Sequence, residues 1–172
     1  TLLFFISDNG GPTAELTSSN QPLRGGKGSV YEGGLRVPFL LQWPSVKPHG
    51  QTYSAPVCSV DIAATALAAA ASERPAGSPG DGVNLLPFLT GSQSGQPHAE
   101  LFWRVGNRAA IRSGDWKALR NGGSKKDEWE LYKLTDDVGE SRSLSRVEPD
   151  RLARLRDQWE EINAEMIEPL WR

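Results

Sequence analysis

The 172-residue sequence has little of several features that would place it in a class at once. It contains one cysteine, Cys58, so neither an internal disulfide framework nor a cysteine-rich zinc site can form within it. No apolar run approaches the ~20 residues that a membrane-spanning helix requires. Nineteen basic and twenty-one acidic residues give a net charge of −2, which supplies no argument for nucleic acid or an anionic membrane as a partner. The composition is that of a globular protein, long enough for one domain, or for one domain with an appended lobe.

The sequence also begins without an initiator methionine or a signal-peptide pattern. It opens on Thr1 and enters an apolar run at once, residues 2–6, which is typical of a strand covered on both faces. Such strands belong to parallel sheets. We therefore expect residues 2–6 to be an inner strand of a larger α/β sheet whose earlier strands precede this sequence. Ligands of such sheets bind beyond the carboxyl ends of the strands, which is where Asp8 and Asn9 stand.

The following elements are predicted from periodicity and from proline and glycine positions. Residues 37–43 form a second apolar run, bracketed by prolines, that suits another strand of the sheet. An alanine-rich helix is predicted over 59–71, and a helical turn over 85–89. The apolar face predicted for the helix consists of Ile62, Ala66 and Ala69 or Ala70.

The C-terminal part of the sequence has a different residue pattern. Turn residues separate the strand-like runs 101–105, 108–112, 116–119 and 130–134, which predicts a three- or four-stranded antiparallel meander. Residues 149–167 have apolar side chains three or four apart, so we expect a helix that packs on one face of the meander. The stripe consists of Leu152, Leu155, Trp159, Ile162 and Met166. Proline-, glycine- and serine-rich connectors favour a division into residues 1–97, part of an α/β domain, and residues 98–172, an antiparallel-sheet subdomain with a terminal helix.

Two segments before residue 32 carry candidate chemistry. Asp8 and Asn9 are hard oxygen ligands beside two glycines, a combination that suits a calcium or magnesium ion; the alternative is an ordinary turn. Lys27 lies on a glycine-rich loop that lacks the spacing of phosphate-binding and dinucleotide-binding motifs. It is either a cation that approaches an anion closely or a solvated lysine.

Other residue types give weaker indications. His49 and His98 lie in connectors without a second ligand at metal spacing, so we expect surface histidines. Cys58 has no neighbouring histidine or asparagine that would indicate a nucleophile, and we expect a small buried hydrophobic residue.

Taken together, three motifs resemble the sulfatase family, of the arylsulfatase type: SDNGG at 7–11, PLRGGKG at 22–28 and YEGGLRVP at 31–38. The resemblance covers essentially the whole chain. It continues through WP at 43–44, VDIAAT at 60–65, DGVNL at 81–85, GDWK at 114–117 and ELYKL at 130–134, with Asp137 and Glu140. Lys133 stands where the family commonly has Asp, and Val138 where it commonly has Pro. Both lie in the distal lobe, away from the motifs of residues 7–38. The chain is similar to the carboxyl-terminal portion of such an enzyme, which implies part of an alkaline-phosphatase-like fold.

The resemblance implies roles for three residues. Asp8 and Asn9 would bind the active-site Ca²⁺, and Lys27 would contact the sulfate as a catalytic and substrate-binding residue. Glu32 and Arg36 would tie the loop down through buried hydrogen bonds. The family's nucleophile is a formylglycine made within a Cys/Ser-x-Pro-x-Arg motif, which this chain lacks; Cys58 has neither the proline nor the arginine. We therefore expect the motif upstream.

The expected function is hydrolysis of sulfate esters by a calcium-dependent sulfatase, with this chain inactive by itself. Substrates would be aryl sulfates or sulfated carbohydrates, without nucleic acid and without a membrane span; the oligomeric state is open. Localisation by resemblance is extracytoplasmic: periplasmic, secreted or lysosomal. Two alternatives stay open. One is a phosphoester or phosphonate ester hydrolase on the same scaffold, and the other is a non-catalytic module that binds a sulfated glycan or a protein.

Overall fold

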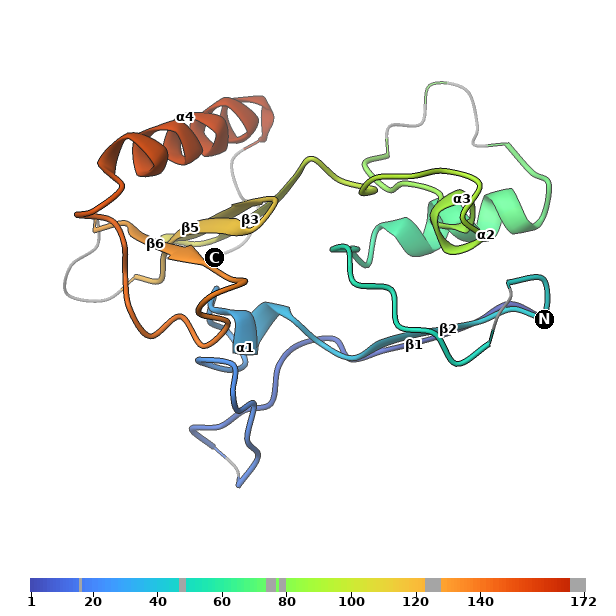
Figure 1. Ribbon diagram of the computed structural model, residues 1–172, viewed down its shortest axis with the longest axis horizontal. Helices are drawn as coiled ribbons and strands as arrows, with labels where there is room; N and C mark the ends of the chain where they lie inside the picture. The colour runs from blue at the N-terminus through green and yellow to red at the C-terminus, as the bar shows by residue number, and fades with distance from the viewer. Residues whose placement is uncertain (16, 47–48, 74–76, 78–79, 123–127, 168–172) are drawn as a thin grey trace. The chain divides into compact units, whose positions relative to one another are not determined.

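The computed structural model describes residues 1–15, 17–46, 49–73, 77, 80–122 and 128–167 (Figure 1). The chain forms two compact units, each described here by itself. The first consists of residues 1–6 and 38–99, and the second of residues 7–37 and 100–172. The segment that carries Asp8, Asn9 and Lys27 therefore groups with the C-terminal sheet. The division into domains at residues 97 and 98 stays a prediction about the family fold.

The first unit contains a two-stranded ribbon of β1 (Leu3–Ile6) and β2 (Phe39–Gln42). Where we expected residual strands of a parallel sheet, these two strands pair antiparallel with each other, with Ile6 opposite Phe39 and Leu3 opposite Gln42. An uninterrupted apolar run predicts burial, and it contains no information on the direction of the neighbouring strand. One face of the ribbon is exposed, at Leu3 (52%), Phe5 (61%) and Leu40 (57%).

Helix α2 (Asp61–Ala69) and the short helix α3 (Leu86–Leu89) complete this unit. The apolar face predicted for α2 is wrong in part: Ile62 and Ala69 are half-buried, but Ala66 and Ala70 are exposed, and the fully buried residues are Asp61 and Thr65. The physical reason is hydrogen bonding, because the Thr65 hydroxyl accepts the N–H of Leu85 at 3.1 Å. Polar side chains satisfied in this way can occupy the inner face of a helix.

Asp61 forms a buried pair with His98. The carboxylate is fully buried and accepts the N–H groups of Cys58 (2.8 Å) and Val83 (2.9 Å). His98 Nε2 lies 2.9 Å from both carboxylate oxygens, and its side chain is only 11% exposed. His98 is therefore not the surface histidine expected from the sequence, whereas His49 is exposed.

The second unit is built on a four-stranded antiparallel meander in the order β3-β4-β5-β6, as predicted. The strands are β3 (Glu100–Val105), β4 (Arg108–Ser113), β5 (Trp116–Arg120) and β6 (Glu130–Lys133). Because side chains alternate between the faces of a strand, each strand supplies two separate cores.

Helix α4 (Pro149–Glu165) covers one face of the meander (Figure 1). Its Leu155 and Trp159 pack with Ile111, Ala118 and Leu131 in a buried cluster that Leu152 and Ile162 also join. The stripe prediction is confirmed for these four helix residues and wrong for Met166, which is 44% exposed at the end of the helix. Each buried side chain of this size contributes about 1.5–3 kcal/mol to folding.

The opposite face of the meander is covered by residues 30–35, which include the four-residue helix α1 (Glu32–Leu35). Val30 and Tyr31 pack there with Ala110, Leu119 and Tyr132. Figure 1 shows α4 and α1 on opposite sides of this sheet. The sheet therefore supports the segment that carries the candidate site.

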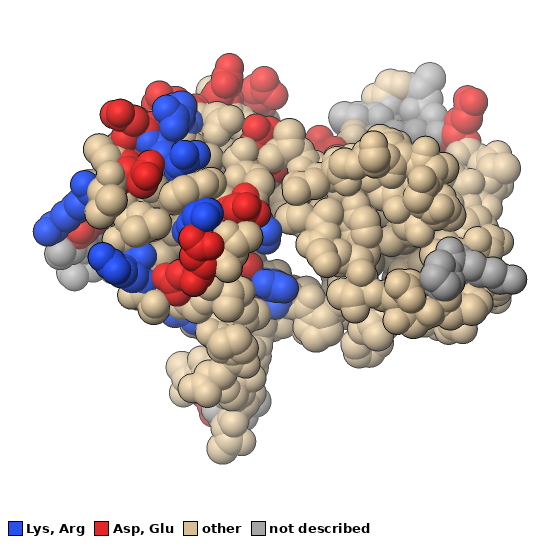
Figure 2. Space-filling view, viewed as in Figure 1, with Lys and Arg blue, Asp and Glu red and all other residues tan. Residues whose placement is uncertain are grey.

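The charged side chains on the face drawn in Figure 2 gather over the unit that contains α4, with both signs interspersed. No helix in the described part of the chain is long and apolar enough to cross a membrane.

The Asp61 pair gives a stability prediction. Asp61→Asn replaces one acceptor oxygen by an amide that opposes a backbone N–H, and it removes the charge facing His98. We expect the free energy of unfolding to fall by about 3 kcal/mol. Denaturant titration measures this change. Asp81→Asn, at an exposed position of the same unit, is the control and should stay within about 0.5 kcal/mol of the wild type. Equal effects of the two substitutions would contradict the buried pair.

Candidate active site

The turn after β1 carries Asp8 and Asn9, whose side-chain oxygens are candidate metal ligands. Ser7 Oγ donates to the carbonyl oxygen of Asn9 at 2.9 Å, and Asn9 Nδ2 donates to that of Gly10 at 3.0 Å. The second bond holds the amide nitrogen of Asn9 against the backbone. Within the described residues, neither Asn9 Oδ1 nor the exposed Asp8 carboxylate has a hydrogen-bond or ion-pair partner. Both groups are available to a ligand.

The loop that carries Lys27 lies directly against this turn. The Lys27 N–H donates to the carbonyl oxygen of Gly11 at 3.2 Å. Asn20 cross-links the two segments: its Oδ1 accepts the Gly11 N–H at 2.9 Å, and its Nδ2 lies 3.0 Å from the carbonyl oxygens of Gly11 and Gly25. The Lys27 side chain is exposed, and its ammonium group contacts no acidic group in the part of the chain that the structure describes. The structure thus brings together the backbones of the two predicted half-sites, which are the turn of Asp8 and Asn9 and the loop of Lys27.

Glycine is required where these segments meet. A Cβ atom on Gly10 would collide with the carbonyl oxygen of Gly33, and one on Gly26 with that of Gly11. A Cβ on Gly34 would collide with the carbonyl oxygen of Ser29. No residue with a side chain fits at these backbone contacts without a shift, which explains the glycine content of the segment.

Helix α1 contacts both half-sites. Its Gly33 N–H donates to the carbonyl oxygen of Arg24 at 2.8 Å, beside the Lys27 loop. Its Gly34 carbonyl accepts the N–H of Gly10 at 3.1 Å, beside the turn of Asp8 and Asn9. The position of α1 therefore sets the positions of both loops.

Arg24 ties the Lys27 loop to the meander. Its Nη1 donates to the Tyr132 hydroxyl (3.0 Å) and to the Glu140 carbonyl (2.9 Å), and it lies 3.4 Å from Glu130 Oε2. The guanidinium also stacks on the ring of Tyr31, 4.0 Å from its centroid. This network fixes the loop at the third residue before Lys27.

Both tyrosines of the network donate to Glu130. The Tyr31 hydroxyl lies 2.7 Å from Glu130 Oε1, and the Tyr132 hydroxyl bonds to Oε2. Burial, followed by the hydrogen bond to the carboxylate, raises the pKa of Tyr31 and of Tyr132. The two phenols stay protonated, so they act as donors and not as nucleophiles.

The side-chain oxygens of Asp8 and Asn9 fit part of a calcium coordination shell. Carboxylate and amide oxygens are the ligands that Ca²⁺ prefers, but the ion takes about 6 to 8 oxygens. Among the described residues, no cluster of three or more His, Cys, Asp or Glu side chains could hold a metal ion. Asp8 and Asn9 could therefore supply only part of the shell.

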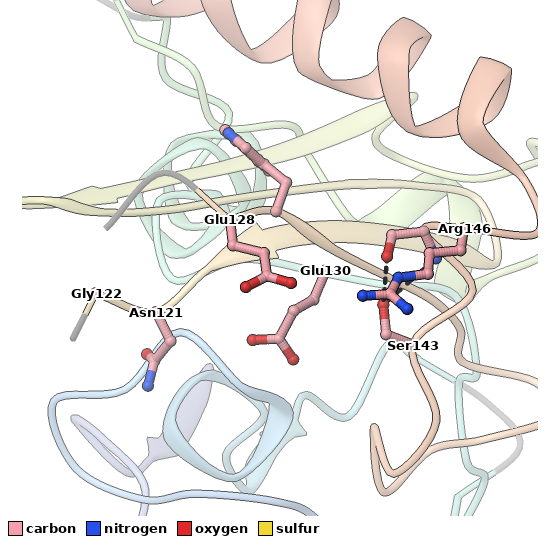
Figure 3. A pocket seen from close by; sticks show the side chains of 8 residues that line it. Asn121, Gly122, Glu128, Glu130, Ser143 and Arg146 are labelled. Carbon is pink, nitrogen blue, oxygen red and sulfur yellow. Dashed lines mark hydrogen bonds between the residues drawn. The ribbon is translucent and has the colours of Figure 1, made fainter. Parts of the chain in front are cut away.

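A pocket of about 470 Å³ opens on the meander beside the anchoring residues. Figure 3 shows Glu128 and Glu130 between Asn121 and Arg146 along its wall. Asn121 and Glu130 also hold the Lys27 loop, through Val30 (N–H to Oδ1, 2.9 Å) and Tyr31.

Comparison with known proteins decides the family. The sulfatase family model matches residues 1–72, which include the turn, the Lys27 loop and α1. The chain belongs to the sulfatase family. It is 34% identical over 137 residues to the steryl-sulfatase of Rattus norvegicus, covering 69% of this chain and 23% of that protein. It is 27% identical over 186 residues to an N-acetylgalactosamine-6-O-sulfatase of Bacteroides thetaiotaomicron, covering 94% of this chain and 36% of that protein.

A solved structure supports the same conclusion. The crystal structure of Ps i-CgsB in complex with k-i-k-neocarrahexaose matches 99% of this chain with a TM-score of 0.85 and 31% identity. The match covers 38% of that chain. This sulfatase chain therefore has a fragment of the alkaline-phosphatase-like fold, and it spans less than two fifths of the length of these relatives.

Three residues that hold the loops were not found by sequence reasoning. They are Asn20, Arg108, which donates to the carbonyl of Gly28, and Asn121. The role expected for Glu32 as a buried tie is confirmed, because Glu32 is 3% exposed and bonded to Lys117. Arg36 is exposed, which does not fit a buried tie.

The glycine contacts predict the effect of one added methyl group. Gly26→Ala places Cβ against the carbonyl oxygen of Gly11, so we expect the Lys27 N–H bond to break. The free energy of unfolding should fall by about 2–3 kcal/mol. Gly106→Ala is the control, since Gly106 has a φ of +56° but open space around it, and backbone strain alone costs about 1 kcal/mol. Denaturant titration compares the two, and amide exchange at Lys27 reports the lost bond. A Gly26→Ala cost no larger than that of the control would show that the contact is not tight.

Proposed function

We propose that this chain is the C-terminal part of a calcium-dependent sulfatase that hydrolyses sulfate esters. In this proposal Asp8 and Asn9 bind the metal ion and Lys27 binds the sulfate. The observation that carries it is the 3.2 Å bond from the Lys27 N–H to Gly11, which holds a cation-bearing loop against a turn with two free oxygen donors. Family membership supplies the reaction class.

The chemistry follows from the charges of these groups. A sulfate ester carries negative charge on its non-bridging oxygens, and more charge develops on the leaving oxygen as the ester bond breaks. Asp8 and Asn9 would hold a divalent ion, which would supply positive charge near the sulfate, and Lys27 would bind a sulfate oxygen through its ammonium group. A formylglycine supplied from upstream would provide the nucleophile. The residues of this chain contribute binding, orientation and charge neutralisation, so the chain alone is expected to be inactive.

The substrate class that we propose is a sulfated carbohydrate. Two relatives that align with nearly the whole chain point this way: an N-acetylgalactosamine-6-O-sulfatase and a protein solved with k-i-k-neocarrahexaose. The steryl-sulfatase of Rattus norvegicus aligns with 69% of the chain. Turnover of a sulfated monosaccharide, an aryl sulfate and an aryl phosphate by the intact protein distinguishes the possibilities. Preference for the aryl phosphate would favour the phosphoester alternative. The extracytoplasmic location is part of the same proposal.

Lys27 gives the first functional prediction. Lys27→Ala should lower kcat/KM for a sulfate ester by about 100-fold or more, because a cation that stabilises charge in the transition state is lost. Lys133→Ala removes another lysine, which is partly exposed and paired with Asp136 at 2.9 Å, and should leave kcat/KM within about twofold. Steady-state kinetics on the intact protein measures both. Similar small effects would refute the assignment of Lys27.

Metal binding gives a second prediction. Asp8→Asn keeps the shape of the side chain and removes its charge, so the Ca²⁺ concentration for half-maximal activity should rise at least about tenfold. Calcium titration after chelation measures the shift, and isothermal calorimetry with Ca²⁺ measures binding without turnover. Asp115→Asn, in the turn between β4 and β5, is the control. Unchanged calcium affinity in Asp8→Asn would exclude Asp8 as a ligand.

A further inference from the structure

Helix α1 has to be held in place by groups outside it. It is four residues long, far too short to be stable by itself, and two of those residues are glycines. Yet it contacts the Lys27 loop through Gly33 and the Asp8 turn through Gly34. A Cβ on Gly33 would lie 2.5 Å from the carbonyl oxygens of Arg24 and Gly25, so the loop rests directly on the backbone of the helix. Any displacement of α1 would displace Lys27.

A buried group of three charges, here called the Lys117 cluster, holds α1. Lys117 Nζ, from β5, lies 2.8 Å from Glu32 Oε1 and 2.9 Å from Glu140 Oε1. Glu140 Oε2 accepts the backbone N–H of Glu32 at 2.6 Å. The side chains of Lys117 and Glu140 are fully buried, and that of Glu32 is 4% exposed. The first residue of α1 is therefore fixed through both its side chain and its backbone.

Stability alone does not account for this arrangement. Removing three charged groups from water is costly, and an apolar cluster of similar volume often gives equal or greater stability. Burial also raises the pKa of Glu140, against the effect of Lys117. In addition, Glu140 has a φ of +50°, a left-handed conformation that is unfavourable for a non-glycine residue. The cluster instead fixes the position of α1, because the short bonds between its charged groups allow only one placement of α1 on β5.

Glu140 also contacts the Lys27 loop, through its backbone carbonyl. Its carbonyl accepts a bond from Arg24, while its carboxylate binds Glu32 and Lys117. One strained residue thus connects the start of the Lys27 loop with the start of α1.

We propose that the Lys117 cluster positions Lys27 for sulfate binding, with Lys117 and Glu140 as positioning residues that do not touch the substrate. This inference rests on the proposed function. It assigns to the C-terminal meander a part in the reaction, namely to hold one sulfate-binding side chain at a fixed place.

The test is a double-mutant cycle in the intact protein with a sulfate ester as substrate. Glu140→Gln retains the shape of the side chain but can no longer accept from both Lys117 and the Glu32 N–H. We expect kcat/KM to fall about tenfold or more, because misplacing a catalytic cation is costly. The same substitution made on top of Lys27→Ala should have little further effect, since Lys27 is the group that it misplaces. Lys117→Met should behave in the same way, and Glu140→Gln carries the test alone if that variant does not fold.

Hydrogen exchange gives a readout that does not depend on turnover. In Glu140→Gln, amides of residues 24–34 should exchange about tenfold faster while those of α4 stay protected. Arg104→Met is the control in the same unit. Arg104 joins β3 to the end of α4 through Asn163 (2.8 Å) and Ile167 (2.5 Å), so its loss should affect α4 and spare residues 24–34.

The outcomes separate the two claims. If Lys27→Ala does not lower kcat/KM, the proposed function fails. If Lys27→Ala lowers it but the cycle is additive, or if exchange rises equally throughout the unit, the cluster has a general structural role and the positioning inference is overturned.

Discussion

The candidate site depends on backbone packed against backbone. The turn after β1, the Lys27 loop and α1 meet at Gly10, Gly26 and Gly34, where a side chain would strike a neighbouring carbonyl oxygen. This close approach lets the Lys27 N–H reach the carbonyl of Gly11 and the Gly10 N–H reach that of Gly34. Main-chain contacts of this kind are less adaptable than side-chain contacts, because a backbone cannot choose another rotamer. The geometry of the site is therefore built into the path of the chain.

The meander supports this arrangement because its strands serve two cores. Ile111 and Ala118 face α4, while Ala110 and Leu119 face the segment with Val30 and Tyr31. Alternation of side chains along a strand produces this division. Stabilisation by α4 on one face therefore also supports, through the same strands, the segment that carries Lys27 on the other.

Much of the fold could be predicted from the sequence, since periodicity records local burial. Apolar spacing and turn residues alone predict the meander, α4 and the presence of a strand at β1. Helix α1 could not be predicted, because two of its residues, Gly33 and Gly34, oppose helix formation and only the surrounding contacts hold it. The antiparallel pairing of β1 and β2 and the pairing of Asp61 with His98 depend on long-range contacts that local patterns do not record.

The candidate site was predictable to a different extent. Asp8, Asn9 and Lys27 were chosen by residue type and by family resemblance, and the structure places the backbones of their segments side by side. Their supports were harder to find. Lys117 shares a strand face with the buried Leu119, which was the available signal for a buried cation, but its two partners come from distant segments around Glu32 and Glu140. Sequence spacing alone could not have joined the three.

The register of the β1–β2 ribbon has a consequence for the whole site-bearing segment. Because Ile6 pairs with Phe39, residues 7–38 form a loop whose ends are joined to paired strands. Closing the loop in advance removes chain entropy that the loop would otherwise lose when its turns assemble. A slip of the ribbon by one residue would invert the side chains of β1 with respect to β2. The register of two short apolar strands thus decides where this loop begins and where it ends.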